Sequence, residues 1–184
     1  MGKLSTEISD EHKIFIEKQK MFFVATAPLS DEGHINLSPK GLEHLQVLNA
    51  NQVAYLDFVG SGNETSAHLL ENKRITIMFC SFDKVPNILR LYGKGKAVLP
   101  TSNEWDAYAS NFPTILGTRQ IIVADIYHVQ TSCGFGVPIY DYVGDRDILF
   151  DWANKKGEEG IELYQKEKNH FSIDQLPTHL QAEG

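Results

Sequence analysis

The stretch YLDFVGSGNETSAHLLENKRITIMF, residues 55 to 79, combines a strand, a glycine-containing loop, a short helix and a second strand. Apolar, β-type residues run up to Gly60, and a second such run covers residues 75–79. Asn63 stands where the helix begins, at a position that favours asparagine as the N-cap. The free N–H groups at such a helix N-terminus suit a phosphate. A tight turn followed by a capped helix, with no ligand, is the alternative interpretation.

A dinucleotide-binding fold is a further alternative for this stretch. Gly60 and Gly62 open a strand–loop–helix–strand unit, and Asp83 follows about twenty residues later, as that fingerprint requires. Thr65, however, stands where the third glycine is expected, and the helix is short for a crossover between parallel strands. No further alternation of strands and helices follows. A nicotinamide-cofactor site is therefore the least favoured interpretation.

The rest of the chain indicates a curved antiparallel sheet. Strand-like patterns cover residues 21–30, 34–41, 45–49, 53–59, 74–82, 87–99 and 120–132. We expect about six strands in an antiparallel barrel with helices at its margins. From residue 144 the pattern changes to two helices broken at Gly157, without a Pro- or Ser-rich linker. We therefore expect one domain over residues 1–184, with a barrel at 20–143 and a helical appendage at 144–184.

Composition narrows the class of partner. The 184 residues carry a net charge of −7, with 24 acidic against 17 basic side chains, which disfavours a nucleic-acid partner. The two cysteines are too far apart in the chain for a disulfide framework, and the seven histidines lack the spacing of a metal site. No signal peptide or long apolar span is present, so we expect a cytoplasmic protein with no membrane partner.

Two strand segments carry polar side chains that suit an anion. Ser38 and Lys40 alternate at a strand end, so they share a face, and a lysine beside a hydroxyl there can point at an anion. Arg90 shares a strand face with Tyr92 and two lysines, which makes a local positive stripe. The alternatives are a solvated charge on an edge strand for Lys40 and an ordinary exposed strand face for the stripe.

The order FFVATA…GHINLSPKG…VAYLDFVGSGNETSAHL…RITIMFCSF…ILRLYGKGKAV resembles the pyridoxamine 5′-phosphate oxidase-like family over residues 20–130. The segments SPKG, GSGNET and CGFGVPIYDY are similar to those of an uncharacterised subgroup. The resemblance implies a six-stranded antiparallel split β-barrel of the FMN-binding type, and a homodimer with FMN in a groove between subunits. The FMN contacts that it implies are Ser38, Lys40, Ser61, Gly62, Asn63, Glu64, Thr65, Arg90, Ser132 and Cys133.

Neither the substrate nor a catalytic residue follows from the resemblance. The vitamin B6 oxidases bind the substrate phosphate with an arginine-rich C-terminal segment, whereas this chain has no arginine beyond Arg146. Glu64, where it faces the site, would repel a second phosphate. A reactive thiol at Cys133 would need a nearby base, and a tight turn of small residues is the favoured interpretation there. Two function classes stay open: an FMN-dependent oxidoreductase acting on an unknown small molecule, and a non-catalytic flavin-binding or flavin-sensing protein.

Overall fold

The computed structural model describes residues 2–42 and 44–182. Its strands are β1 (Leu4–Ser5), β2 (Phe22–Thr26), β3 (Asn36–Lys40), β4 (Leu45–Asn49), β5 (Gln52–Phe58), β6 (Arg74–Cys80), β7 (Ile88–Val98) and β8 (Thr118–Ser132). Its helices are α1 (Asp10–Lys18), α2 (Glu64–Asn72), α3 (Trp105–Ala109), α4 (Ile148–Lys168) and α5 (His179–Ala182).

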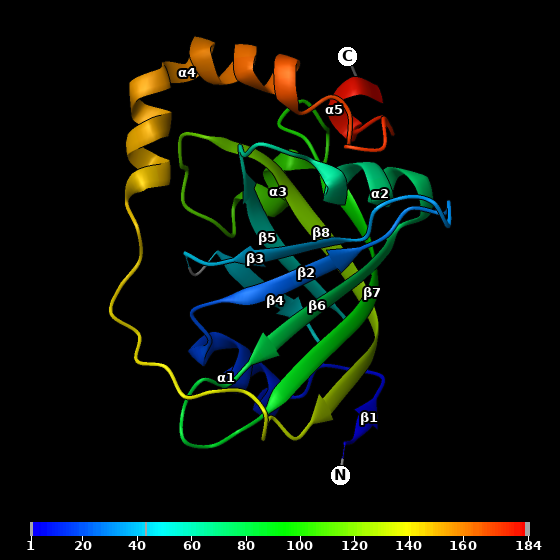
Figure 1. The fold of residues 1–184 in the computed structure, drawn as a ribbon, viewed down its shortest axis with the longest axis vertical. Coiled ribbons are helices and arrows are strands. Elements are labelled where there is room, and N and C mark those ends of the chain that lie inside the picture. Colours follow the sequence, from blue (N-terminus) through cyan, green and yellow to red (C-terminus); the bar gives the residue numbers. More distant parts are fainter. Residues whose placement is uncertain (1, 43, 183–184) are drawn as a thin grey trace.

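The strands form one antiparallel sheet with helices at its margins, which confirms the predicted fold class (Figure 1). Neighbours follow the order β3-β2-β6-β7-β8-β5-β4, and β1 pairs with β8 outside this path. The predicted number of six strands is wrong, because the described residues form eight. The strand β1 consists of Leu4 and Ser5, which pair with the end of β8. Two residues are too few to show the alternation by which a strand is recognised in a sequence.

The sheet is rolled, so that β3, at one edge, meets β5, the strand next to the other edge. An ion pair between Lys40 in β3 and Asp57 in β5 joins these two strands across the interior. Lys40 lies opposite Phe22 and Ser38 opposite Val24, and directly paired residues point to the same side of a sheet. Because Phe22 and Val24 belong to the buried core, Ser38 and Lys40 face the barrel interior, as their shared face predicts.

The helices cover the outside and one end of the barrel. Apolar residues of α3 pack on the outer faces of β5 and β8, and residues Ala153 and Ile161 of α4 pack with Val59 beyond the end of β5. The predicted break at Gly157 is confirmed, since its φ of 67° and ψ of 173° interrupt α4 in a region open almost only to glycine. Among the described residues, no helix combines the length and apolarity that a membrane crossing requires.

Candidate functional site

A buried ion triad lies inside the rolled sheet. The Asp57 carboxylate, 1 % exposed, accepts hydrogen bonds from Lys40 Nζ at 2.7 Å and from Arg119 Nη2 at 2.8 Å. Gln120 Nε2 donates to the same carboxylate at 2.7 Å. Two cations against one carboxylate leave one surplus positive charge. Lys40 is 25 % exposed and Arg119 is 4 % exposed, so the surplus charge is accessible at Lys40.

The charges of the triad fix two protonation states. Burial by itself would raise the pKa of the Asp57 carboxyl, but Lys40 and Arg119 hold this pKa well below its usual range. Burial, and then the negative charge of Asp57, raise the pKa of the Tyr55 hydroxyl well above its usual value. Asp57 is therefore ionised and Tyr55 neutral at neutral pH, and neither is poised to exchange a proton there.

The loop before α2 is tied to the triad. Arg119 Nη1 donates to the carbonyl oxygen of Gly62 at 2.8 Å, and Gln120 Nε2 donates to Asn63 Oδ1 at 2.8 Å. Asn63 is the N-cap residue of α2, as predicted, but its side chain makes no capping hydrogen bond. Its amide nitrogen donates instead to the carbonyl oxygen of Asn169 at 3.1 Å. Long-range polar partners have thus replaced the local bond that the sequence suggested.

Ser38 and Thr65 meet through Asn36. Asn36 Nδ2 donates to Thr65 Oγ1 at 3.0 Å, and Ser38 Oγ donates to Asn36 Oδ1 at 2.8 Å. The structure thus brings four predicted site residues, Ser38, Lys40, Asn63 and Thr65, into the polar interior. Asn63 and Thr65 are 2 % and 6 % exposed. Both side chains form hydrogen bonds with other residues of the same chain.

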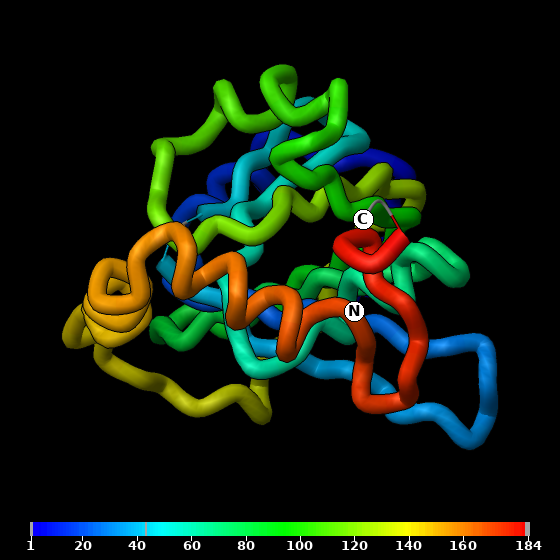
Figure 2. The backbone as a smooth tube through the Cα atoms, turned by 90° about the horizontal axis from the view of Figure 1, so that it is seen from above, coloured from blue at the N-terminus to red at the C-terminus, as the bar shows by residue number. Residues whose placement is uncertain are grey.

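The C-terminal residues 169–182, called the C-terminal clasp below, pass over α2 and beside the β2–β3 turn (Figure 2). The backbone N–H of Ile173 donates to Glu64 Oε1 at 3.2 Å, and the N–H of His179 donates to Ser66 Oγ at 3.1 Å. The N-terminus of α2, predicted to be open to a ligand, is therefore covered by the chain itself. Of the predicted loop residues, Ser61 is exposed.

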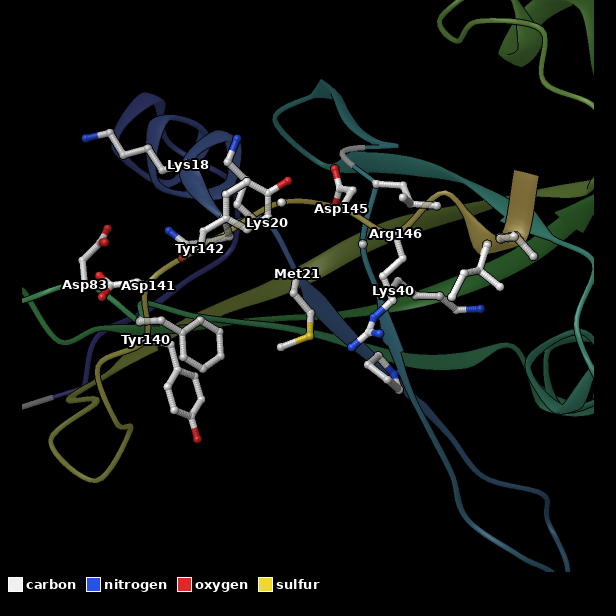
Figure 3. Close-up of a pocket in the computed structure, with 18 of the residues that line it drawn as sticks. Lys18, Lys20, Met21, Lys40, Asp83, Tyr140, Asp141, Tyr142, Asp145 and Arg146 are labelled. Atoms are coloured by element: carbon white, nitrogen blue, oxygen red, sulfur yellow. The ribbon is translucent and has the colours of Figure 1, made fainter. Parts of the chain in front are cut away.

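A pocket of about 840 Å³ opens beside Lys40, between the end of α1, the adjoining ends of β2 and β3, and residues 140–152. In Figure 3, Lys40 and Arg146 lie at one end of this Lys40 pocket, Met21 lies in the middle, and Tyr140 and Tyr142 lie toward the other end. Lys40 and Arg146 thus place two of the four lining cations at one end of an apolar and aromatic wall, and Lys18 and Lys20 are the other two. The lining also carries three carboxylates, those of Asp83, Asp141 and Asp145. The cationic end beside the apolar and aromatic wall suits a ligand with an anionic group and a flat ring system.

Arg90, Ser132 and Cys133 lie elsewhere on the sheet. Arg90 Nη1 donates to Ser132 Oγ at 2.9 Å, and the neighbouring Cys133 is exposed. Arg90 alternates with the buried residues Leu89 and Leu91, so it faces the outside of the barrel, whereas Lys40 faces the interior. None of the three lines the Lys40 pocket. The structure therefore separates them from the other predicted contacts.

Several residues of this site were missed by the sequence interpretation. Asp57 stands in the apolar run VAYLDFV. A charged residue in such a run indicates a buried ion pair, because ionised side chains are almost never fully buried unless they are paired. Its partner Arg119 is 62 residues away in the chain, and no local pattern links the two. Arg146 was noted only as the last arginine of the sequence, and its position in the pocket depends on the path of the segment after β8.

Comparisons with known proteins agree with this architecture. The sequence profile of the family Pyridoxamine 5′-phosphate oxidase matches residues 8–133. The pyridoxamine 5′-phosphate oxidase family protein ustO of Aspergillus flavus is 37 % identical over 189 residues, which cover 92 % of this chain and 75 % of that protein.

Two solved structures share the fold at low sequence identity. HupZ of Group A Streptococcus has a TM-score of 0.52 and 18 % identity over 66 % of this chain and 91 % of its own. A candidate pyridoxamine 5′-phosphate oxidase from Lactobacillus delbrueckii has a TM-score of 0.51 and 12 % identity over 68 % of this chain and 94 % of its own. From the family profile and the fungal relative, we conclude that this chain belongs to the pyridoxamine 5′-phosphate oxidase family.

Proposed function

We propose that this chain binds FMN and acts as a flavin-dependent oxidoreductase on a small molecule. The observation that carries the proposal is the Lys40 pocket, where the surplus positive charge of the triad meets an apolar and aromatic wall. A phosphate dianion and an isoalloxazine ring require these two environments side by side. Membership of the family supports a flavin as the ligand with this chemistry.

The residues of the pocket fit FMN in size and in donors. Its volume of about 840 Å³ lies within the range of small-molecule pockets. The ammonium of Lys40 can donate to a phosphate, and the guanidinium of Arg146 offers a planar fork for the same group. The flavin, when bound, supplies the electron-transfer chemistry, and the residues of this chain bind and orient it. The loop residues Ser61–Thr65 stay predicted phosphate contacts, and the clasp would have to move before they could all serve as such.

We further propose a homodimer in which Arg90, Ser132 and Cys133 approach the flavin of the second copy. They lie on the outer face of the sheet, apart from the Lys40 pocket of their own chain. The segment after β8 leaves large apolar side chains exposed, including Phe135 at 82 % and Val143 at 98 %. Exposed apolar surface of this kind is typical of a protein–protein interface. The two free thiols, one of them exposed, suit a reducing compartment, and we propose the cytoplasm.

A flavin-binding protein without turnover is the second candidate. Asp57, the ion-pair partner of Lys40, is held ionised, and the buried Tyr55 is held neutral, so they supply no acid or base near neutral pH. Anaerobic reduction of the flavin-loaded protein by NADH or NADPH, followed by a screen of electron acceptors, separates the two classes. Turnover with any acceptor supports the oxidoreductase, and a flavin that is never reoxidised by a substrate supports the second candidate.

The cofactor itself is tested by releasing any bound yellow compound from the purified protein and identifying it by chromatography. We expect FMN at one equivalent per chain, or uptake of added FMN by a protein purified without it. Stoichiometric FAD, or a persistent failure to take up FMN, would contradict the proposal.

A further inference from the structure

One wall of the Lys40 pocket is a single segment, residues 138–147, called the pocket strap below. Its residues Tyr140, Tyr142 and Arg146 line the pocket. The strap runs along the outside of the barrel, from the turn after β8 to the start of α4 (Figure 1). It forms neither a helix nor a strand, and each of its residues is exposed. The pocket therefore has one wall that no regular secondary structure supports.

The chain is anchored on both sides of the strap. A Cβ atom at Gly134 would lie 2.9 Å from the backbone nitrogen of Asn87, so the chain packs closely against the start of β7 there. On the other side, the rings of Phe150 in α4 and Phe58 in β5 pack edge to face, with centroids 5.9 Å apart. Between these anchors, Gly144 has a φ of 155° and open space around its Cβ position. Side chains disfavour such a φ, so Gly144 gives the strap a point at which it can turn.

The strap contacts the opposite side of the pocket through aromatic rings. Tyr140 stacks on Phe82 with centroids 5.6 Å apart, and its backbone N–H donates to the carbonyl oxygen of Phe82 at 3.1 Å. Lys20 Nζ lies 5.5 Å from the centroid of the Tyr142 ring. Tyr140 and Tyr142 are nevertheless 65 % and 53 % exposed. Because such contacts are weak where water reaches them, the strap belongs to the parts of the protein that open locally at low cost.

Arg146 is the strap residue at the cationic end of the pocket. Within the part of the chain that the structure describes, neither its guanidinium nor the carboxylate of the neighbouring Asp145 forms an ion pair or a hydrogen bond. Lys40, which lies at the same end of the pocket in Figure 3, carries the same charge as Arg146. The barrel holds Lys40 through Asp57 at 2.7 Å, whereas Arg146 moves with the strap. Since like charges repel each other, this end of the strap needs an anion to tie it to the barrel.

We infer that the pocket strap is a lid, and that Arg146 closes it by taking the phosphate group of the ligand as its acceptor. This inference rests on the proposed function, which places that phosphate beside Lys40. The planar fork of the guanidinium suits a phosphate that Lys40 also holds, and the shared acceptor ties the strap to β3. Tyr140 and Tyr142 lie on the same strap, so its closure also fixes the aromatic wall against the ring of the ligand. The lid thus selects phosphorylated over unphosphorylated ligands.

The test compares Arg146→Gln with the matched control Lys18→Gln in the full chain. Both changes replace an exposed cation of the pocket lining by a neutral side chain, but Lys18 belongs to α1 and not to the strap. Cleavage by chymotrypsin after Tyr140 or Tyr142, located by mass spectrometry, reports an open strap, because proteases cut exposed segments without secondary structure. Without ligand, we expect this cleavage at the same rate in the wild-type chain and in both variants.

Cleavage is then measured with saturating FMN and with saturating riboflavin, which lacks the phosphate. Both ligands carry the same ring, so the difference between the two rates isolates the phosphate. In the wild-type chain and in Lys18→Gln, cleavage should be about tenfold slower with FMN than with riboflavin, because one charge-assisted hydrogen bond shifts the ratio of closed to open strap by about this factor. In Arg146→Gln, the two rates should be equal.

Three results would each overturn the lid while FMN still binds and the proposed function stands. The first is a strap that resists chymotrypsin without ligand. The second is equal protection by FMN and riboflavin in the wild-type chain. The third is a difference between the two ligands that persists in Arg146→Gln.

If FMN binds to no form of the protein, the proposed function fails, and inorganic phosphate then decides the lid. Slower cleavage with phosphate in the wild-type chain, lost in Arg146→Gln, would support the lid with another phosphorylated ligand. Equal cleavage with and without phosphate, or slowing that persists in Arg146→Gln, would overturn it. The same measurement replaces the comparison of flavins if riboflavin does not bind.

Discussion

Replacement of Lys40 by methionine tests where the phosphate binds. Methionine retains the length and the apolar stem of lysine and removes only the charged end. Asp57 keeps Arg119 and Gln120 as partners in this variant, so the fold should persist. The variant therefore separates the surplus positive charge of the triad from its structural role.

The size of the effect follows from the contacts of Lys40. A hydrogen bond to a charged group contributes about 1.5–3 kcal/mol. Because the ammonium of Lys40 is already shared with Asp57 at 2.7 Å, we expect the lower end of this range. A loss of about 1.5 kcal/mol corresponds to about tenfold weaker binding of FMN. Riboflavin, which has no phosphate, should lose no affinity.

Fluorescence titrations of FMN and riboflavin against the same protein samples measure both affinities. Lys20→Met is the matched control, because Lys20 lines the same pocket but lies over the ring of Tyr142, 5.5 Å from its centroid. It should leave the ratio of FMN affinity to riboflavin affinity unchanged. The reasoning is refuted if Lys40→Met also leaves this ratio unchanged, or if it weakens both ligands equally.

The remaining predictions concern stability, chemistry and assembly. Arg119→Met should lower the free energy of unfolding by about 3–5 kcal/mol, because it leaves the buried Asp57 carboxylate with Lys40, which is 25 % exposed, as its one cationic partner. Urea unfolding, expected as one transition, measures this. Since the folded-state pKa of Asp57 is depressed, its stabilisation is present above the ordinary carboxyl pKa of about 3.9 and is lost as the pH falls below it. Asp57→Asn should therefore flatten the loss of stability in acid, and an unchanged acid profile would contradict this. Formation of pyridoxal phosphate from pyridoxamine 5′-phosphate should be slow, because the chain has no arginine beyond Arg146. An assay of this reaction that finds a rate typical of a dedicated oxidase would contradict the prediction. Light scattering on the flavin-loaded protein should give twice the chain mass of 20.7 kDa, and a monomer that keeps its flavin would exclude the shared site.

Local sequence patterns were sufficient for the class of fold. Alternating and apolar runs located the long strands, because side chains of a strand point to its two faces in turn. The same period placed Ser38 and Lys40 on one face, and the structure has them on the inner face. Gly157 marked the break in the C-terminal helix, since its backbone conformation is open almost only to glycine. The order of these segments also carried the resemblance to the family.

The partners of the polar residues could not be read from such patterns. A strand period says which face a residue occupies, but it does not say which strands meet when the sheet rolls. The pairing of Lys40 with Asp57 spans 17 residues, and that of Asp57 with Arg119 spans 62. Asn63 looked like a helix cap in the sequence, yet its side chain bonds to residues brought near only by folding.

The contacts of the C-terminal clasp are the clearest example of partners that the sequence patterns could not identify. The tail was predicted as two helices, and nothing in its sequence pointed to the loop before α2. Asn169 and Gly60, which are hydrogen-bonded, lie 109 residues apart in the chain. Hydrogen bonds between polar side chains and distant backbone groups leave no periodic signal, because they depend on the position of a few atoms rather than on a repeated face. Whether the predicted phosphate loop is open or covered was therefore decided by tertiary packing.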